Sequence, residues 1–304
     1  MVNILGLNSG PIDNPAVPLW RPDRLLEGAN GGVMGLFDLS YSRCYPGVAT
    51  GRDPVSGDVI KDIATIQVDG SQSATTYNGA IEVAYDGGIP DYAGNGFDYS
   101  AVPIIGTVIA TPAIAPHVVA QAAQYFFQAL YVRLPTKAQW HSGSSVRPFS
   151  AFTTDANGFQ AEPDLLTIGQ AYSAGPLLRA VRTTAAGVYE QLQFAPLDAH
   201  FGQVAQILWW RNAAGIGLQL RTAAGGVQSV TGAVGAKTTQ DLTGKKWRVG
   251  LGTSFWPGTP GNPAKFRVFR GWIEDTEASG RDARTVADED WQRVTARPTR
   301  VAFS

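Results

Sequence analysis

Short runs in which apolar and polar residues alternate dominate the chain, and such runs are typical of β-strands. In the segment 265–279, KFRVFRGWIEDTEAS, one face of an extended backbone carries Phe269, Gly271 and Ile273. The opposite face carries Val268, Arg270, Trp272 and Glu274. The absence of a side chain at Gly271 allows a neighbouring backbone or sheet to approach closely. The pattern therefore predicts a strand that packs against the rest of the domain and carries a large aromatic residue on its other face.

Further strands are predicted from apolar runs that small turns separate. The run 125–134, YFFQALYVRL, is apolar on both faces, which favours a central position in a sheet. Turns rich in alanine and glycine join successive strands, as in an antiparallel meander; they are 184–187, 212–215 and 223–226. Short helices are predicted at 116–124 and 285–297, and a last strand at 300–303. Together these elements predict an all-β protein built from antiparallel strands.

The segment from Phe269 to Asp275 has the order aromatic-x-Gly-x-Ile-acidic-acidic. It resembles the closing strand of concanavalin A-like jelly rolls of the laminin G and lectin type, and it is most similar to lectin-like domains in virion proteins of tailed bacteriophages. The resemblance implies a two-sheet jelly-roll sandwich over residues 36–304. It also implies a non-enzymatic structural or attachment role in a virion, as a tail or neck fibre, a baseplate component or a capsid decoration protein.

The first 35 residues are predicted to form an extended arm. Prolines recur there every three or four residues and hold the backbone extended. Apolar anchors stand between them, namely Leu5, Leu7, Leu19, Trp20 and Leu25. The arm is expected to lie on its own domain or on a neighbouring subunit. The expected partners are therefore other virion proteins and further copies of the chain.

Composition excludes several functional classes. Charged residues make up 16% of the chain, against about 25% in an average globular protein. The net charge of −1 gives no electrostatic basis for binding nucleic acid. Cys44 is the single cysteine, so neither an intrachain disulfide nor a cysteine-based zinc site can form. Prolines interrupt the apolar run 102–123, and the N-terminus does not follow the signal-peptide pattern, so we expect no membrane insertion and synthesis in the host cytoplasm.

Candidate catalytic residues are few. Glu274 and Asp275 are adjacent and point to opposite faces of a strand, so they do not form the paired acids of a glycosidase. With Glu277 they are interpreted as a solvated strand end. The histidines are isolated in the sequence and match no HExxH or Gly-x-Ser-x-Gly motif; they are His117, His141 and His200. We therefore predict a non-enzymatic protein, with a glycan-cleaving enzyme on the same scaffold as an alternative.

Tryptophans are the main binding candidates. Trp209 and Trp210 are consecutive on a strand, so one faces the core and the other faces outward. An outward indole can stack on a sugar ring or be buried in a subunit interface. Trp256 and Trp272 offer the same choice. The second alternative is therefore a carbohydrate-binding adhesin that contacts a glycan of the host surface.

One loop contains oxygen ligands that could bind calcium. Asp91, Asn95 and Asp98 lie close together in it, but their spacing is not that of an EF-hand. Solvated turn residues account for the same composition. We therefore expect no cofactor and no metal, with calcium at this loop as the open alternative.

Overall fold

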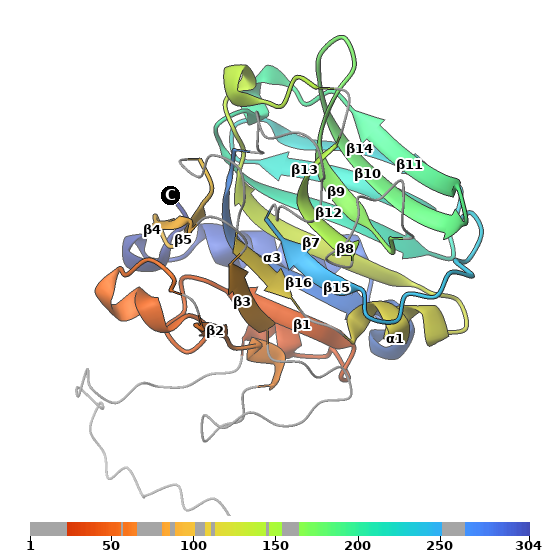
Figure 1. Cartoon of the computed structure of the whole chain (residues 1–304), viewed down its shortest axis with the longest axis horizontal. Coiled ribbons are helices and arrows are strands. Elements are labelled where there is room, and N and C mark those ends of the chain that lie inside the picture. The colour runs from red at the N-terminus through yellow and green to blue at the C-terminus, as the bar shows by residue number, and fades with distance from the viewer. Residues whose placement is uncertain are drawn as a thin grey trace, which may run out of the picture.

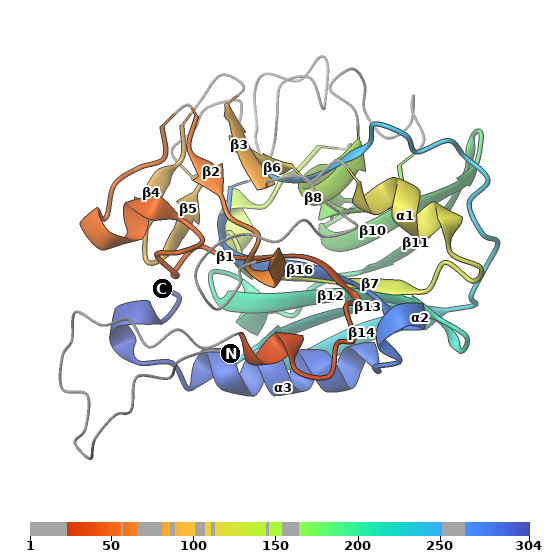
Figure 2. The same ribbon diagram turned by 90° about the horizontal axis from the view of Figure 1, so that it is seen from below.

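The computed structural model describes residues 23–55, 57–65, 81–85, 89–100, 107–110, 113–143, 146–153, 164–250 and 265–304. Antiparallel strands form two large sheets that pack face to face, and a long helix covers the outer face of one of them (Figure 1, Figure 2). The predicted all-β, two-sheet sandwich is therefore confirmed. The narrower assignment to the concanavalin A-like type stays a prediction.

The larger sheet has eight strands in the order β14-β13-β12-β7-β16-β5-β4, and β1 also pairs with β16. The bounds are β1 (Val33–Asp38), β4 (Asp91–Ala93), β5 (Gly96–Asp98), β7 (Phe126–Arg133), β12 (Val204–Asn212), β13 (Gly215–Thr222), β14 (Gly226–Gly232) and β16 (Arg267–Asp275). The strand predicted to be central, β7, lies between β12 and β16 and is buried along almost all its length. The predicted meander is also present as β12, β13 and β14.

The second sheet has five strands in the order β11-β10-β9-β8-β15. The bounds are β8 (Arg147–Thr153), β9 (Thr167–Tyr172), β10 (Pro176–Ala185), β11 (Val188–Phe194) and β15 (Lys246–Val249). A small third sheet consists of β2 (Val59–Ile60), β3 (Ile81–Tyr85) and β6 (Thr107–Ala110). The 3-10 helices are η1 (Arg24–Leu26), η2 (Pro46–Thr50), η3 (Ile63–Thr65), η4 (Lys137–Gln139), η5 (Asp198–His200) and η7 (Thr299–Val301).

The α-helices are α1 (Ile114–Ala120), α2 (Thr276–Ser279) and α3 (Ala283–Thr295). The side chain of Asp282 accepts a hydrogen bond from the Thr285 N–H and caps the start of α3. Val286 and Val294 of α3 are buried, and the helix runs along the outer face of the eight-stranded sheet (Figure 2). Among the described helices, none is both long enough and apolar enough to cross a membrane.

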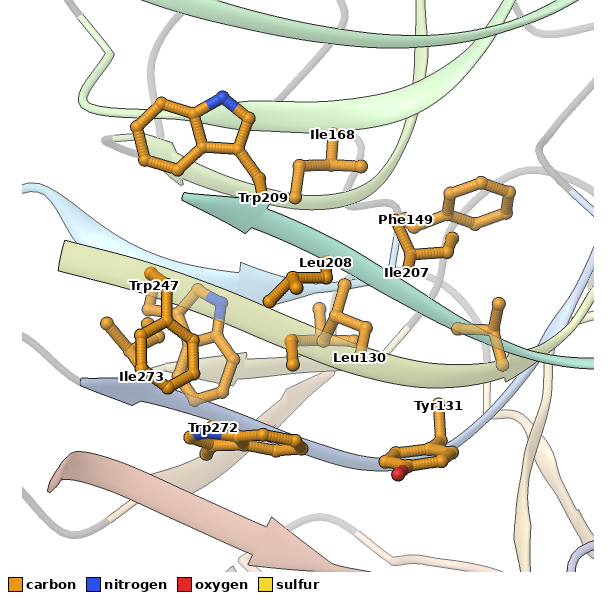
Figure 3. Packing of buried hydrophobic residues seen from close by; sticks show 14 of the residues in the cluster. Leu130, Tyr131, Phe149, Ile168, Ile207, Leu208, Trp209, Trp247, Trp272 and Ile273 are labelled. Atoms are coloured by element: carbon orange, nitrogen blue, oxygen red, sulfur yellow. The ribbon is translucent and has the colours of Figure 1, made fainter. Parts of the chain in front are cut away.

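The two faces of the eight-stranded sheet bury different aromatic residues. Trp209 points from β12 toward the five-stranded sheet, beside Ile168, whereas Trp272 and Tyr131 lie on the opposite side (Figure 3). On that opposite side, the ring of Tyr131 stacks on Trp291 of α3 with 6.1 Å between ring centroids. The sheet therefore has a hydrophobic layer on each face, one against the second sheet and one against α3.

A β-bulge corrects the predicted faces of the closing strand. In β16, Val268 pairs with Val132 and Arg270 pairs with Tyr131, so Phe269 is the extra residue between them. Val268 therefore shares the face of Gly271, and Phe269 instead stacks on Phe303 with 4.7 Å between centroids. An alternation read from the sequence cannot account for this inserted residue.

The prediction of a strand at 300–303 is wrong. Thr299–Val301 forms a 3-10 turn after Pro298, and the segment is fixed by other contacts. Ala302 accepts a hydrogen bond from the Asn95 side chain, and the Ser304 N–H donates to the Gly94 carbonyl. Phe303 stacks on the bulged Phe269. Side-chain packing therefore replaces strand pairing at this end of the chain.

The folded domain begins before the predicted boundary at residue 36. Val33 pairs with Glu274 in the register of β1 and β16. Leu25 is fully buried, and Asp23 forms an ion pair of 2.7 Å with Arg270. Residues 23–35 are thus part of the sandwich. Among the predicted arm anchors, Leu5, Leu7, Leu19 and Trp20 lie outside the described residues.

We expect Gly271→Val to destabilise the fold. A Cβ at Gly271 would lie 2.7 Å from Leu130 Cδ2 and 2.8 Å from Phe37 Cε1, and overpacking of this kind costs about 3 kcal/mol. Gly175→Val is the matched control, since nothing lies within 4 Å of its added Cβ. Urea unfolding measures the stability of both variants. Equal midpoints would show that no neighbouring side chain packs closely against Gly271 of β16.

A second prediction concerns the start of the domain. The chain lacking residues 2–30 should be less stable than the chain lacking residues 2–22 by about 3 kcal/mol or more, because only the first loses Asp23 and the buried Leu25. Thermal and urea unfolding of the two truncated chains provide the comparison. Equal stabilities would place the start of the domain after residue 30.

Candidate functional site

The carboxylates at the end of β16 have structural partners. Glu274 is fully buried, and its Oε2 lies 2.5 Å from Arg281 Nη2. Glu277 accepts hydrogen bonds from the backbone N–H groups of Ala123 and Tyr125. The interpretation of this cluster as a solvated strand end is therefore wrong for Glu274 and Asp275, which are buried, whereas Glu277 is exposed.

Asp275 points to the other side of the strand, as the sequence indicated. Its Oδ2 lies 3.0 Å from His117 Nε2 on α1. Its Oδ1 accepts hydrogen bonds from the N–H groups of Glu277 and Ala278 and so caps α2. Burial alone would raise the pKa of Asp275, but these hydrogen bonds, with the one from His117, lower it below its usual value. This pair joins α1 to the closing strand.

Three of the four predicted tryptophans are buried within the chain itself. Trp209 and Trp272 lie in the two hydrophobic layers of the eight-stranded sheet. Trp210 faces the α3 side, where the Arg284 guanidinium lies 5.8 Å from its ring centroid. An indole in these positions cannot stack on a sugar in the folded chain. The outward residue of the Trp209–Trp210 pair is covered because a helix packs on that face. Trp256 lies outside the described residues.

Two carboxyl groups have raised pKa values, which can mark a functional site. Burial raises the pKa of Asp62 to about 7 and that of Asp164 to about 7. Asp62 accepts the N–H of Leu36, and Asp164 accepts those of Phe152 and Leu166. These carboxyls fix backbone segments, which accounts for their burial without a ligand.

Two of the three predicted calcium ligands, Asp98 and Asn95, are engaged by protein groups. Asp98 forms a 2.5 Å ion pair with Arg267, and the Asn95 amide donates to the Ala302 carbonyl. Asp91 lies opposite Asp98 in the β4–β5 hairpin. Among the described residues, no group of three or more His, Cys, Asp or Glu side chains could hold a metal ion.

A cavity with a volume of about 490 Å³ lies at one end of the sandwich. It is bordered by η4, the segment after it, the β9–β10 turn and the residue that leads into β16. Its lining residues are Lys137, Ala138, Gln139, Trp140, Ser142, Tyr172, Pro176 and Lys265. A smaller cavity of about 200 Å³ lies beside Arg297, where Asp23 and Asp38 are held by arginines. The larger cavity is the candidate functional site.

Local sequence fixes the wall that η4 provides. The Gln139 side chain accepts hydrogen bonds from the Thr136 N–H and hydroxyl, at 3.1 and 2.9 Å, in a capping box. Trp140 Nε1 donates to the Ala171 carbonyl at 3.0 Å, which joins this wall to β9. The Trp140 ring meets Phe201 edge-on with 5.4 Å between centroids. The back of the cavity is therefore fixed by hydrogen bonds and packing.

Tyr172 provides an exposed aromatic ring at the cavity. It ends β9, pairs with Pro176 of β10 and is 37% exposed. The turn between them contains Ala174 with a φ of 57°, a left-handed conformation that is strained for a residue other than glycine. This strained turn sets the separation of Tyr172 and Pro176 across the rim.

Both charged residues in the described lining are lysines. Lys137 Nζ lies 2.7 Å from Asp198 Oδ1, in a pair with both side chains mostly exposed. Lys265 Nζ donates to the Ser100 carbonyl at 3.0 Å and forms no ion pair with the described residues. The cavity thus combines an aromatic ring, a hydroxyl group and ammonium groups, which suits a hydroxylated and anionic ligand.

The residues of this cavity are not among those that the sequence pattern indicated as binding candidates. The Thr136-x-x-Gln139 capping signal and a tyrosine before the turn Ser173-Ala174-Gly175 could have been noted. Neither signal predicts that Lys137, Tyr172 and Lys265 lie close together, because their proximity depends on the packing of three separate segments.

No protein-family model matches the chain, and no curated protein matches it in sequence. Solved structures with a similar fold include tailspike protein 2 of Escherichia coli O157:H7 bacteriophage CAB120, at 13% identity and a TM-score of 0.36, covering 60% of this chain and 23% of the tailspike. A Trypanosoma rangeli sialidase, in complex with a difluorinated KDN, has 11% identity and a TM-score of 0.44, covering 90% of this chain and 36% of the sialidase.

A third similar structure is the CBM40 domain of the Ruminococcus gnavus IT-sialidase bound to α2,3-sialyllactose. It has 11% identity and a TM-score of 0.36, covering 62% of this chain and 91% of that domain. The chain therefore spans less than half of the tailspike and of the trypanosomal sialidase. At these identities and TM-scores, the likeness concerns the β-sandwich alone.

The expectation of a non-enzymatic protein is corrected by the same comparisons. The similar structures include sialidases and the enzymatically active domain of the phage tailspike. The lack of a recognisable catalytic motif in the sequence therefore does not make the chain non-enzymatic.

Proposed function

We propose that the protein is an attachment protein of a tailed-phage virion and that its end cavity binds a host-surface glycan with an acidic sugar. The single observation that carries the proposal is the cavity lined by Tyr172, Lys137 and Lys265. Its volume of about 490 Å³ falls within the roughly 300–1,000 Å³ of ligand pockets. This size suits one or two sugar rings.

The lining residues support a saccharide. The exposed Tyr172 ring offers an apolar face on which the C–H groups of a sugar can stack. Ser142 and the lysines offer polar groups for sugar hydroxyls. An apolar surface with a few convergent polar groups is the usual composition of a specific small-molecule site.

The charge of the cavity favours an acidic sugar. Lys137 is already paired with Asp198, whereas Lys265 is held by a neutral carbonyl. A carboxylate in the cavity would therefore meet at least one ammonium group that has no carboxylate beside it. A charge-assisted hydrogen bond of this kind is about twice as strong as a neutral one.

The virion part of the proposal is supported by the sequence. The closing strand resembles those of lectin-like domains in phage virion proteins, and the low charge content of 16% suits a chain that is largely covered in an assembly. A phage tailspike among the structures with a similar fold is in keeping with this role. The expected partners are the host glycan, other virion proteins and further copies of the chain.

Glycan binding can be tested by calorimetric titration with α2,3-sialyllactose and a galacturonate trisaccharide, with lactose as the neutral match. We expect Tyr172→Ala to weaken binding of the acidic probes about tenfold or more, because the stacking surface is lost. Lys265→Met should weaken the binding of the acidic probes but not that of lactose, and added salt should have the same effect. Reducing-end release in the same samples records any cleavage.

The matched control is Tyr189→Ala, which removes another exposed tyrosine, one that lies on β11 outside the cavity lining. Its affinity for each probe should equal that of the unmodified chain. If Tyr172→Ala and Tyr189→Ala bind alike, or if no acidic saccharide of the panel binds, the cavity is not the glycan site.

The strained turn gives a separate stability prediction. Ala174→Gly should stabilise the protein by roughly 0.5–1 kcal/mol, since glycine adopts the left-handed conformation without penalty. The control is Ala214→Gly in the β12–β13 turn, where φ is not positive and the change should be neutral or destabilising. Urea midpoints measure both, and a destabilised Ala174→Gly would contradict the strain at this rim.

A further inference from the structure

Two long edge strands without outward charges lie on the same side of the molecule. β14 ends the eight-stranded sheet and β11 ends the five-stranded sheet. They lie beside each other, on the side opposite β4 and β5 (Figure 1). The side chain of Gln228 connects them, because it donates to the Ala195 carbonyl and accepts from the Leu197 N–H. Together β11 and β14 form a continuous lateral face.

Neither strand is protected against pairing with another chain. β14, GVQSVTG, contains no charged residue and no proline. The one charged residue of β11, Glu190, forms a 2.9 Å ion pair with the buried Arg182. Proteins usually protect exposed edges with charges, prolines, bulges or very short strands. None of these devices is present on β14.

The opposite edges are protected by these devices. β4 has three residues and contains the exposed Asp91, and β15 has four residues and contains Lys246, whereas Arg248 of β15 is buried. The contrast lies within a single molecule, so it does not reflect a general shortage of charged residues. Exposed aliphatic residues add to the open side, with Val188, Leu197 and Val227 each 54% exposed. Among the described edge strands, β14 is the one that combines full strand length with the absence of charge and proline.

We infer that this lateral face binds a second copy of the chain, with β14 of the two copies paired antiparallel across a two-fold axis. In the described part of the chain, the backbone of residues 227–232 makes no hydrogen bond beyond its ladder with β13. Pairing with a copy would use the backbone N–H and C=O groups on the open edge of β14. This inference does not depend on the proposed glycan site.

Symmetry explains why the partner is a copy. When a strand pairs antiparallel with itself, the residue on the axis faces its own copy, so a charged residue there would face a like charge, which is destabilising. β14 has no such residue, so its sequence is compatible with self-pairing. In the centred register, Ser229 faces Ser229 of the copy at the axis, and Val227 faces Thr231 of the copy. The eight-stranded sheets would then continue across the dimer.

The first test is a disulfide at the axis in the full-length chain. Cys44 is buried, so it leaves a clean background for introduced cysteines. Ser229→Cys should form a covalent dimer under mild oxidation, because facing residues on antiparallel strands lie within the range of a disulfide. Ala93→Cys, on the opposite edge of the same sheet, is the control and should stay monomeric on a non-reducing gel.

The second test introduces charge at the axis. Sedimentation of the full-length chain over a wide concentration range should show a dimer, and Ser229→Lys should raise its dissociation constant about tenfold or more. The control is Val55→Lys, which adds the same charge at another exposed site and should leave the dimer intact. Val55 follows Asp53, whose side chain accepts a hydrogen bond from the Tyr92 N–H of β4. Circular dichroism of each variant verifies the fold.

A chain that sediments as a monomer at its highest soluble concentration overturns the inference. A dimer that Ser229→Lys leaves unchanged also overturns it, since the interface would then lie elsewhere. If the Ser229→Cys variant forms the covalent dimer but binds no glycan, the proposed function is overturned and the dimer inference stands.

Discussion

The buried guanidinium of Arg270 is the interaction on which the assembly of the sandwich depends. Its Nη1 lies 2.7 Å from Asp23 Oδ2 and 3.1 Å from Asp38 Oδ2, and its Nη2 lies 3.1 Å from Asp290 Oδ1. These carboxylates come from the first described segment, from β1 and from α3. Removing one partner from a buried group of charges typically costs about 3–5 kcal/mol. One side chain therefore holds the strand, its neighbour and the covering helix in a single arrangement.

The pKa values follow from this arrangement. Burial alone would raise the pKa of Asp23, but Arg270 more than offsets that effect and lowers it to about 2. Burial likewise opposes ionisation of Asp38, whose pKa is lowered by Arg297 and Arg270. The lowered pKa values of Asp23 and Asp38 thus favour the ionised carboxylates that pair with Arg270.

Sequence periodicity predicted the parts of the fold that depend on local alternation. The central strand β7, the meander and α3 were found because apolar spacing and turn residues determine them. The bulge at Phe269 was missed, because one inserted residue reverses the alternation without changing composition. The buried roles of Glu274 and Asp275 were missed because their partners, Arg281 and His117, are brought there by helices. The end cavity requires three separate segments, which no spacing rule relates.

The use of charge in the interior also bears on the surface. A chain with only 16% charged residues places several of them in buried pairs, including Arg270 with its three carboxylates and Glu274 with Arg281. On the described edge strands, Asp91 lies on β4 and Lys246 on β15, whereas β14 carries no charged residue. Charge at an edge strand controls whether the edge pairs with another chain. The distribution of a few charges therefore determines both how the sandwich is held together and which of its sides is open to a partner.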